Sequence, residues 1–476
     1  MGALQPTGTT REEVLRELKN FAAKDVNWQD GKVLSGVYNP GDKAHELAIE
    51  AYNKFLAQNA LWITMYPSIG LIEKEILDSV VELLRGDDEA VGNITSGGTE
   101  SILMAVKTAR DWARINRPEI TRPEMVLPVT AHPAFLKAAH YFDLKVIQTA
   151  VELDEFRADL DSYKNALGSN TILAVGSAPN YSHGSIDPIS EMASLASEKN
   201  ILFHVDGCVG GIYLSVLRRM GEEVRDFDFS VPGVTSISAD LHKYGYTPKN
   251  ASVVLYRNRE LRKYAWFVSS GTTLYFLINP TTQSSRTGGP IAAAYAVMRY
   301  LGEEGFREIV RQSQEATKVI LEGIAGIEGL DVLGKPDMCM FTMTSHQVNI
   351  FEVDDLMRKR GWQMTPQYSF GGGPANLHVS ITQANVPQAE LFLKDLNDVV
   401  ASLVRSGSSV NRDELAEIVK EVSGKPVEEV MMAIIPVIGL TGMELPKEMA
   451  TLNTILDLLP ADVRDELLKV FFNMTS

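Results

Sequence analysis

The sequence predicts an α/β protein with a large, mostly parallel sheet domain and a smaller α+β domain after it. Between about residues 93 and 256, short apolar runs alternate with stretches of helical periodicity, which is typical of a parallel sheet covered by helices on both faces. After the Gly-Gly-Pro at 288–290 the alternation stops, and a long helical stretch leads into a shorter mixed region. A chain of 476 residues is too long for one typical domain, so two or three are expected.

The N-terminal segment, 1–59, carries amphipathic helical patterns at 10–24 and 43–58. Its few basic residues are not followed by an apolar stretch, so we do not expect a secretory signal. No run in the chain reaches the ~18 apolar residues that suggest a membrane span. We therefore expect a helical start to the fold and no membrane-spanning segment.

The large domain is expected over 60–312. Its strands are short apolar runs that read as buried, and they are expected at 125–130, 145–150, 171–177, 201–207, 235–240 and 251–256. Helical patterns lie between them, for example at 189–199. In open sheets of this kind ligands bind beyond the carboxyl ends of the strands, so residues that follow these runs are candidates for chemistry.

Two regions are expected after the large domain. The helical stretch 291–325 leads into the small α+β domain, which is expected over 313–405. SGSS at 406–409 has the composition of a linker. The remaining extension, 406–476, carries amphipathic helical patterns, and we interpret it as a helical cap or an interaction element without visible chemistry.

Composition limits the classes of partner. The net charge is −16 and the isoelectric point is near 5.1, which argues against nucleic acid or an anionic membrane surface as the main partner. The chain has 2 cysteines, Cys208 and Cys339, too few for a disulfide framework or a cysteine-rich metal site. These observations predict a protein of the reducing cytoplasm that acts on a small molecule.

A glycine-containing stretch, TSGGTESILMA, begins a predicted helix with Ile102, Val106 and Ala109 on one face. Glycines let backbone N–H groups approach a ligand closely, and the start of a helix favours an anion. Gly98 and Thr99 are therefore candidates for a phosphate cradle. Taken alone, the stretch also fits an ordinary loop before a helix.

A second candidate is Asp206 in FHVDGCVGG, at the end of a predicted strand. A carboxylate in this place can serve a metal, a ribose or a protonated pyridine nitrogen, or it can be a solvated or capping residue. His204 is near enough in sequence to share a face with it, but two ligands do not complete a metal site, so none is expected.

The third candidate is Lys243 in SADLHKYGY, which follows another predicted strand. It is either a surface lysine between two strands or a nucleophile. A lysine, an acid and an anion cradle at one edge of a sheet suit pyridoxal 5'-phosphate: the amine forms a Schiff base, the carboxylate keeps the ring nitrogen protonated, and the cradle holds the phosphate. His132, in TAHPAF, can stack on such a ring, although a lone histidine is more often structural.

The stretches TSGGTESILMA, AHPAF, HVDGCVGG and SISADLHKYGY resemble the group II pyridoxal-phosphate-dependent decarboxylases and, within them, most closely the sphingosine-1-phosphate lyases. The resemblance covers roughly residues 30 to 400. It implies the fold-type I architecture, which is like that of aspartate aminotransferase. It also implies that Lys243 carries the cofactor, that Asp206 pairs with the pyridinium, and that His132 stacks on the ring.

The resemblance implies further roles by position. Gly98, Thr99 and His242 would hold the cofactor phosphate. Ser285, in SSRTGG, matches a loop that reaches the phosphate of the neighbouring subunit, which implies a homodimer with shared active sites. Residues that would line the substrate site are Tyr38, Lys249 and Tyr181, the last of them from the partner subunit.

One departure bears on the substrate. NALWITMYP matches the NPLHPDIFP of the lyases, so Trp62 replaces a histidine that helps to bind the substrate phosphate. The expected function is a carbon–carbon lyase that cleaves a phosphorylated amino alcohol to an aldehyde and an amine while the substrate is joined to the cofactor through its amine. Two alternatives are an L-amino-acid decarboxylase and a cofactor-binding scaffold without activity.

Overall fold

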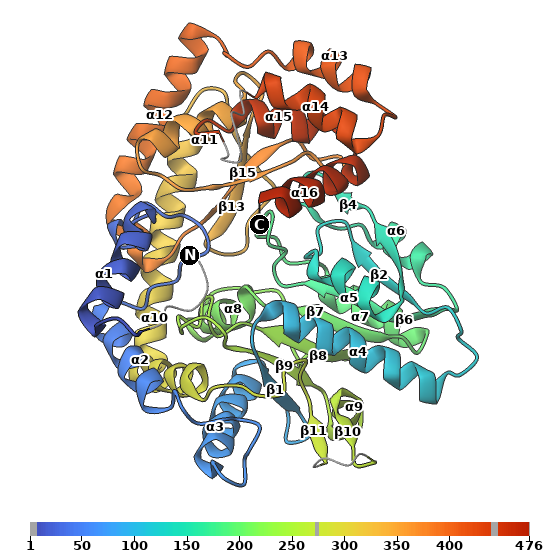
Figure 1. The fold of residues 1–476 in the computed structure, drawn as a ribbon. Helices are drawn as coiled ribbons and strands as arrows, with labels where there is room; N and C mark the ends of the chain where they lie inside the picture. The colour runs from blue at the N-terminus through green and yellow to red at the C-terminus, as the bar shows by residue number, and fades with distance from the viewer. Residues whose placement is uncertain (1–6, 272–275, 439–445, 476) are drawn as a thin grey trace.

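The computed structural model describes residues 7–271, 276–438 and 446–475 (Figure 1). Its centre is a 7-stranded sheet in the order β1-β9-β8-β7-β6-β2-β3. Neighbours are parallel from β8 through to β3, whereas β9 runs antiparallel to both β1 and β8. The predicted, mostly parallel sheet is therefore confirmed. The strands are β1 (Val91–Thr95), β2 (Glu124–Pro128), β3 (Lys145–Thr149), β6 (Thr171–Ser177), β7 (Leu202–Asp206), β8 (Val234–Ala239) and β9 (Ser252–Tyr256).

The strands form because their apolar side chains are buried on both faces of the sheet. In β2, Met125 and Leu127 pack with α4 and α5, while Val126 belongs to the larger core on the opposite face, with α7 and α8. All residues of β6 are buried. The helices of this large domain are α3 (Pro67–Leu83), α4 (Gly98–Asn116), α5 (Ala134–Phe142), α6 (Leu160–Ala166), α7 (Ile189–Glu198), α8 (Gly210–Arg219) and α9 (Arg259–Arg262).

Each predicted strand is found nearly at its expected bounds, but β1 was not predicted. Its sequence, VGNIT, contains a glycine and an asparagine and lacks the continuous apolar run that marks its neighbours. Two hairpins were also not predicted: β4 (Val151–Glu152) with β5 (Arg157–Ala158), and β10 (Phe267–Ser269) with β11 (Leu277–Asn279).

The N-terminal segment and α10 connect the two domains. Helices α1 (Arg11–Phe21) and α2 (Asp42–Lys54) precede the sheet, and α2 packs along α10 (Gly289–Ala325). The predicted long helix is interrupted at Gly302, whose φ of 54° and ψ of −171° are not helical. Between α1 and α2, Leu34 N donates to Gln363 O at 2.9 Å, so the N-terminal segment is also joined to the small domain.

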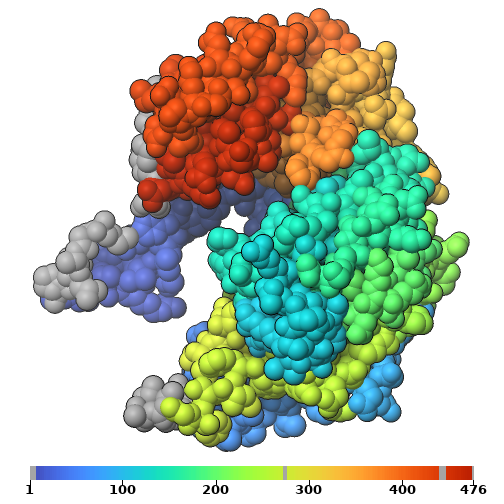
Figure 2. Space-filling view, turned by 90° about the vertical axis from the view of Figure 1, so that its right-hand side faces the viewer, coloured from blue at the N-terminus to red at the C-terminus, as the bar shows by residue number. Residues whose placement is uncertain are grey.

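The small domain is an antiparallel sheet in the order β12-β13-β15-β14 with two helices. The space-filling view shows the molecule hollowed between this C-terminal half, in orange and red, and the α4–α6 region of the large domain, in cyan (Figure 2). The elements are β12 (Leu330–Leu333), β13 (Met340–Ser345), α11 (Ile350–Lys359), β14 (Thr365–Gln367), β15 (Asn376–Ser380) and α12 (Ala389–Ser406).

The C-terminal extension is helical and packs on the small domain. Its own apolar cluster includes Leu415, Val430 and Ile455. Asp457 accepts from Ser369 N at 2.6 Å, which joins the extension to the small domain. Among the residues described, no helix combines the length and the apolarity needed to cross a bilayer. The helices of the extension are α13 (Arg412–Val422), α14 (Val427–Val437), α15 (Ala450–Leu458) and α16 (Ala461–Thr475).

Candidate active site

A cavity of about 360 Å³ lies beyond the carboxyl ends of β7 and β8, beside the start of α4. Its size is typical of small-molecule sites. The sequence candidates from four separate motifs meet here, because the ends of neighbouring parallel strands reach the same edge of the sheet. The lining includes Gly98, Thr99, His132, Tyr181, Asp206, Cys208, Asp240, His242 and Lys243.

Lys243 lies on the turn after β8 and points at a carboxylate that the sequence did not suggest. Its Nζ is 3.0 Å from Asp240 Oδ2, and the side chain of Asp240 is 1% exposed. Burial is the largest single effect on the pKa of Lys243 and would lower it, but the Asp240 carboxylate, with smaller contributions from other groups of the cavity such as Asp206, raises that pKa overall. Burial opposes ionisation of Asp240 as well, and Lys243 together with His242 nevertheless holds its pKa below the ordinary value. Both groups are therefore charged.

Asp206 ends β7, and the neighbouring strand orients it. Its Oδ1 accepts from Cys208 N at 3.0 Å and from Ser238 Oγ at 3.2 Å. Behind it, His204 is fully buried, with Nε2 at 3.3 Å from Ser238 Oγ and Nδ1 at 2.8 Å from Ser236 Oγ. No residue that the structure describes donates to Asp206 Oδ2, so this oxygen can accept a hydrogen bond from a ligand in the cavity.

The predicted cradle lies at the start of α4, a helix of 19 residues whose backbone N–H groups carry a partial positive charge. A Cβ at Gly98 would lie 2.7 Å from Asp240 Oδ2 and 2.8 Å from Cys208 Sγ, so no larger residue fits there without a shift. Thr99 is exposed at the cavity. The predicted helical face of α4 is confirmed, because Ile102 and Val106 are buried in its core.

Two histidines line the cavity. His132 accepts from Ala134 N at Nδ1, and His242 accepts from Ala251 N at Nδ1, so in each neutral ring the proton is on Nε2. Burial lowers the pKa of both, with Asp206 opposing the shift at His132 and Asp240 opposing it at His242. Each ring can therefore donate one hydrogen bond without carrying a charge.

Tyr181 lines the cavity of its own chain, whereas the resemblance implied that it reaches a site from the partner subunit. Its hydroxyl is 3.2 Å from Ser35 Oγ. Tyr38 lies near this group, edge-on to Tyr244 with ring centroids 5.0 Å apart. Lys249 Nζ is 5.0 Å from the centroid of the Tyr38 ring. Of the three predicted substrate residues, Tyr181 thus lines the cavity, whereas Tyr38 and Lys249 contact each other and are not among the lining residues.

Ser285 and Trp62 do not line this cavity. Ser285 is exposed and its Oγ accepts from Asn59 Nδ2 at 3.2 Å. Trp62 is 38% exposed, just before α3. Both residues therefore lie outside the site that Lys243 and Asp206 form in the same chain.

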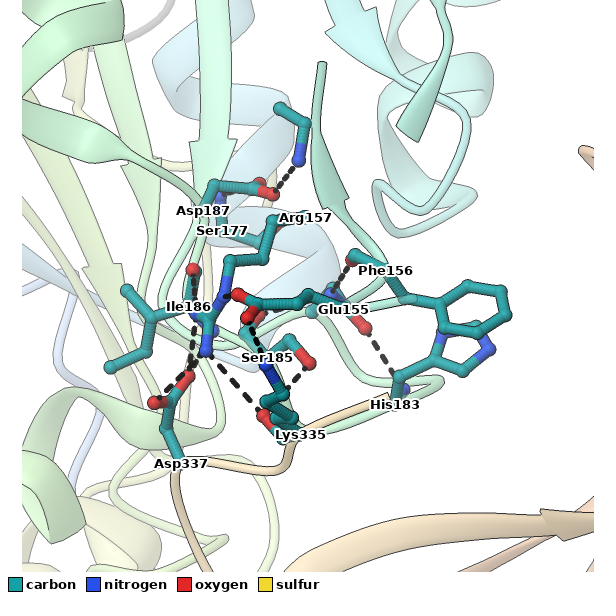
Figure 3. A network of polar contacts seen from close by, with 12 residues as sticks. Glu155, Phe156, Arg157, Ser177, His183, Ser185, Ile186, Asp187, Lys335 and Asp337 are labelled. Atoms are coloured by element: carbon teal, nitrogen blue, oxygen red, sulfur yellow. Dashed lines mark hydrogen bonds and ion pairs between the residues drawn. The ribbon is translucent and has the colours of Figure 1, made fainter. Parts of the chain in front are cut away.

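The loop that carries Tyr181 is clamped between the two domains (Figure 3). Arg157, from the β4–β5 hairpin, donates to Ile186 O and to Asp337 Oδ2, the latter at 2.8 Å. Asp337, from the small domain, also accepts from Ile186 N at 2.6 Å. Figure 3 shows His183 of the same loop stacked on Phe156, with ring centroids 3.8 Å apart. The position of Tyr181 therefore depends on an ion pair that joins the large and small domains.

Comparison with known proteins decides the family. Residues 3–341 match the pyridoxal-dependent decarboxylase conserved domain. The chain belongs to this family. Residues 413–474 match the C-terminal HTH domain of pyridoxal-dependent enzymes, so the extension, which the resemblance did not cover, also occurs in this class of protein.

The similar proteins include both lyases and a decarboxylase. A sphingosine-1-phosphate lyase of Oryza sativa is 42% identical over 403 residues, which is 83% of this chain and 74% of that protein. A sphingosine-1-phosphate lyase of Burkholderia pseudomallei has a solved structure with a TM-score of 0.81 and 34% identity, covering 90% of this chain and 98% of that one. A probable L-aspartate decarboxylase of Pyrococcus abyssi is 29% identical over 84% of this chain and 100% of that protein.

The protein is thus a pyridoxal-phosphate-dependent lyase that resembles the sphingosine-1-phosphate lyases. The residues of the cavity fit the cofactor. The start of α4 offers N–H groups to a phosphate, Asp206 Oδ2 is available to a ring N–H, and the Lys243 amine is within the same cavity. The ring of His132 lines it as well.

Sequence reasoning did not identify Asp240 or the pair of His204 with Ser238. Asp240 stands in the quoted motif SADLHK, three residues before the lysine, and this short spacing on a tight turn was the available signal. The pairing of His204 with Ser238 depends on the register between β7 and β8, which the sequence alone does not provide.

Proposed function

We propose that the protein cleaves a carbon–carbon bond in a phosphorylated long-chain amino alcohol and releases an aldehyde and a phosphorylated amine. The observation that supports this proposal is that the chain is more similar in sequence to the lyases than to the decarboxylase. Sphingosine-1-phosphate lyases from several eukaryotes are 34–42% identical to this chain over most of its length, against 29% for the L-aspartate decarboxylase. The residues of the cofactor cavity serve either reaction, so similarity over the whole chain separates the two.

When bound, pyridoxal 5'-phosphate supplies an aldehyde that joins amines and a ring that takes up the electrons of a broken bond. Lys243 would hold the cofactor through its amine and would give up this place to the amine of the substrate. Asp206 holds a proton at the ring nitrogen through Oδ2. Gly98, Thr99 and His242 would hold the phosphate end, and His132 would stack on the ring.

The remaining residues of the cavity orient the substrate. The residue that anchors the anionic end of the substrate would set the orientation of the substrate in the cavity, and this orientation would decide which reaction follows. Lys249 and Tyr38 are our candidates for this anchor, with Tyr181 as a further candidate that lines the cavity. The Lys249 ammonium already donates to Gly36 O at 3.0 Å, so it is directed at the N-terminal segment beside the site.

One observation favours the second candidate, an amino-acid decarboxylase. Trp62 stands where the lyases have a histidine for the substrate phosphate, and an indole N–H carries no charge. Losing one charged contact to a phosphate would weaken binding by roughly 1.5–3 kcal/mol. A smaller anion, such as a carboxylate, would lose less from this replacement.

The test is a product analysis with the purified holoenzyme. A phosphorylated long-chain amino alcohol is expected to yield a fatty aldehyde, and a panel of L-amino acids is expected to yield no carbon dioxide. Carbon dioxide without aldehyde would make the protein a decarboxylase. Lys243→Ala is the control: turnover that persists in this variant, or no turnover in the wild type with any substrate, would favour a scaffold.

We also propose a cytoplasmic homodimer with shared active sites. In support, Ser285 and Trp62 lie outside the cavity of their own chain, where a second subunit can use them. Apolar side chains are exposed on the segment before and within α3 and on the β10–β11 hairpin, as expected of a surface that another subunit covers: Ile63, Met65, Leu71, Phe267, Val268 and Ile278. Both cysteines are free thiols, which suits a reducing compartment.

A further inference from the structure

We propose that Asp240 is a positioning residue that receives the Lys243 ammonium whenever this amine is not joined to the cofactor. It would hold the lysine before the cofactor binds and again in each turnover, after the amine of the substrate has displaced it. The inference rests on the proposed use of Lys243, but not on the choice between an amino alcohol and an amino acid. No motif in the sequence analysis assigned a role to Asp240.

The geometry is that of a built ion pair. Asp240 directly follows β8 and Lys243 comes three residues later on the same turn, so a short stretch of backbone fixes both side chains. Asp240 Oδ1 accepts from Ser252 Oγ at 2.6 Å, which orients the carboxylate. Ser252 in turn lies 2.9 Å from Ser101 Oγ on α4. The remaining oxygen, Oδ2, faces the Lys243 ammonium at 3.0 Å.

The glycine at the start of α4 also leaves the space that the Asp240 carboxylate occupies. A Cβ at Gly98 would lie 2.7 Å from Oδ2 and 2.9 Å from Oδ1 of Asp240, closer than real Cβ contacts come. The glycine that the sequence assigned to phosphate binding is therefore needed for Asp240 as well. The Asp240 carboxylate thus has a defined position in the site. A glycine leaves room for it, and a serine on the adjacent strand donates to it.

The other charged and titratable groups around Lys243 cannot take this role. Two other carboxylates line the cavity: Asp206, whose Oδ1 is already engaged by Cys208 N and Ser238 Oγ, and Glu100, which accepts from Ser96 N and Thr282 N. The remaining groups that face Lys243 from the packed elements are neutral or positive at neutral pH: Tyr38, His132, Cys208, His242 and Lys249. Asp240 is thus the group that can balance the ammonium at contact distance.

The pair has a chemical consequence. An ammonium cannot attack an aldehyde, so one proton must leave Nζ before the lysine joins the cofactor, and Oδ2 is the acceptor in contact with it. In turnover the direction of proton transfer at Lys243 reverses. The amine of the substrate arrives as an ammonium and loses one proton, while Lys243 leaves as an amine and gains one. By stabilising the charged lysine, Asp240 favours its displacement and holds Nζ away from the substrate.

The test uses the cofactor-free protein and reductive methylation with formaldehyde and cyanoborohydride, which modifies neutral amines. The extent of modification of Lys243 is measured by peptide mass spectrometry over a range of pH, with the exposed Lys19 in the same digest as reference. In the wild type, Lys243 should become reactive at higher pH than Lys19. In Asp240→Asn the midpoint for Lys243 should fall by more than one pH unit, to below that of Lys19, because the buried amine has lost its counter-ion. A midpoint that stays within a few tenths of a unit of the wild type would overturn the proposal.

Two further variants control the experiment. Ser252→Ala keeps the charge of Asp240 but removes its hydrogen bond, so it should shift the midpoint in the same direction by less. If Asp240→Asn does not fold, Ser252→Ala becomes the deciding variant, and an unchanged midpoint in it would overturn the proposal. Asp187→Asn removes another fully buried carboxylate, one that accepts from Ser177 N and Ala158 N, and should leave the midpoint of Lys243 unchanged. An equal shift in Asp187→Asn would mean that any loss of buried charge produces the effect, which would also overturn the proposal.

The outcome is separable from that of the proposed function, because methylation needs no turnover. A shifted midpoint in a protein without lyase activity would refute the lyase and leave the role of Asp240 in place. An unshifted midpoint in an active lyase would refute the role of Asp240 alone.

Discussion

Arg157 is the centre of the clamp on the Tyr181 loop, and its replacement offers a quantitative test (Figure 3). The Arg157 side chain is 8% exposed and that of Asp337 is 23% exposed, with the guanidinium at 2.8 and 3.3 Å from the two carboxylate oxygens. Glu155 Oε2 is a second partner at 2.8 Å. Removing one member of a buried ion pair costs about 3–5 kcal/mol. Because Asp337 keeps some contact with water, we expect about 3 kcal/mol for Arg157→Gln.

The assay is urea denaturation, and the chain provides a matched control. Arg311, on α10, also has two carboxylate partners, Glu308 and Glu315, each at 2.7 Å, but its side chain is 46% exposed. Exposed ion pairs contribute about 1 kcal/mol or less, so Arg311→Gln should change the free energy of unfolding little. If Arg157→Gln costs no more than Arg311→Gln, the clamp does not stabilise the junction of the two domains.

Catalysis supplies a second readout for the same variant. If Arg157 acts through Tyr181, then Arg157→Gln should lower kcat/KM in the wild type and should have almost no further effect in a Tyr181→Ala background. Such non-additivity is expected of residues that act as one unit. Equal losses in both backgrounds would show that the arginine acts by another route.

Three further predictions concern the cradle, the buried histidine and the subunit arrangement. In an equilibrium titration, Gly98→Ala should weaken cofactor affinity at least about tenfold, because the new Cβ would collide with the buried Asp240 carboxylate. Gly70→Ala, where no atom lies within 4 Å of a new Cβ, should leave the affinity unchanged, and equal affinities in the two variants would contradict the packing argument. Burial lowers the pKa of His204 to about 4, while the unfolded chain takes up this proton near pH ~6.5, so stability should fall as the pH drops through this window, by up to about 3 kcal/mol from this residue. Urea midpoints measured against pH should decline less steeply in His204→Gln, and parallel declines would count against this assignment. For shared sites, an equal mixture of two inactive variants, Lys243→Ala and Ser285→Glu, unfolded and refolded together, should recover about a quarter of wild-type activity, because half of the dimers are mixed and each has one intact site; no recovery would place each site within one chain.

The fold could be predicted from the sequence where burial leaves a clear pattern. Strands such as Thr171–Ser177 are buried throughout and mostly apolar because helices cover both faces of the sheet, and all the predicted strands of the large domain are present. β1 was missed because Gly92 and Asn93 interrupt its apolar pattern. Its place in the sheet comes from pairing with β9, a contact distant in sequence.

The candidate site could be predicted only in part, for the same reason. Asp206 and Lys243 were recognised because the first ends a strand and the second follows one, and the carboxyl ends of these parallel strands lie at the same edge of the sheet. The contacts of Asp240 and His204 depend on register and on the fold of a turn, neither of which has a signal in composition. The assignment of Tyr181 to a partner subunit stays a prediction; within one chain, the loop at 178–187 is held against the cavity of that chain by contacts with both domains.

The reversed direction of β9 has a consequence for how the two ends of the cofactor are spaced. The chain passes from β8 through the Lys243 turn directly into β9, which pairs with β1, and β1 leads into the cradle. Thr95, the last residue of β1, lies opposite Ser252, the first residue of β9. The start of α4, which we propose to hold the phosphate, and the turn that carries Lys243 are therefore connected to the same antiparallel pair of strands. Neither segment can move along the sheet without breaking the hydrogen bonds between β1 and β9. The backbone therefore fixes the distance between the two segments, and with it the length of the molecule that can bind between them.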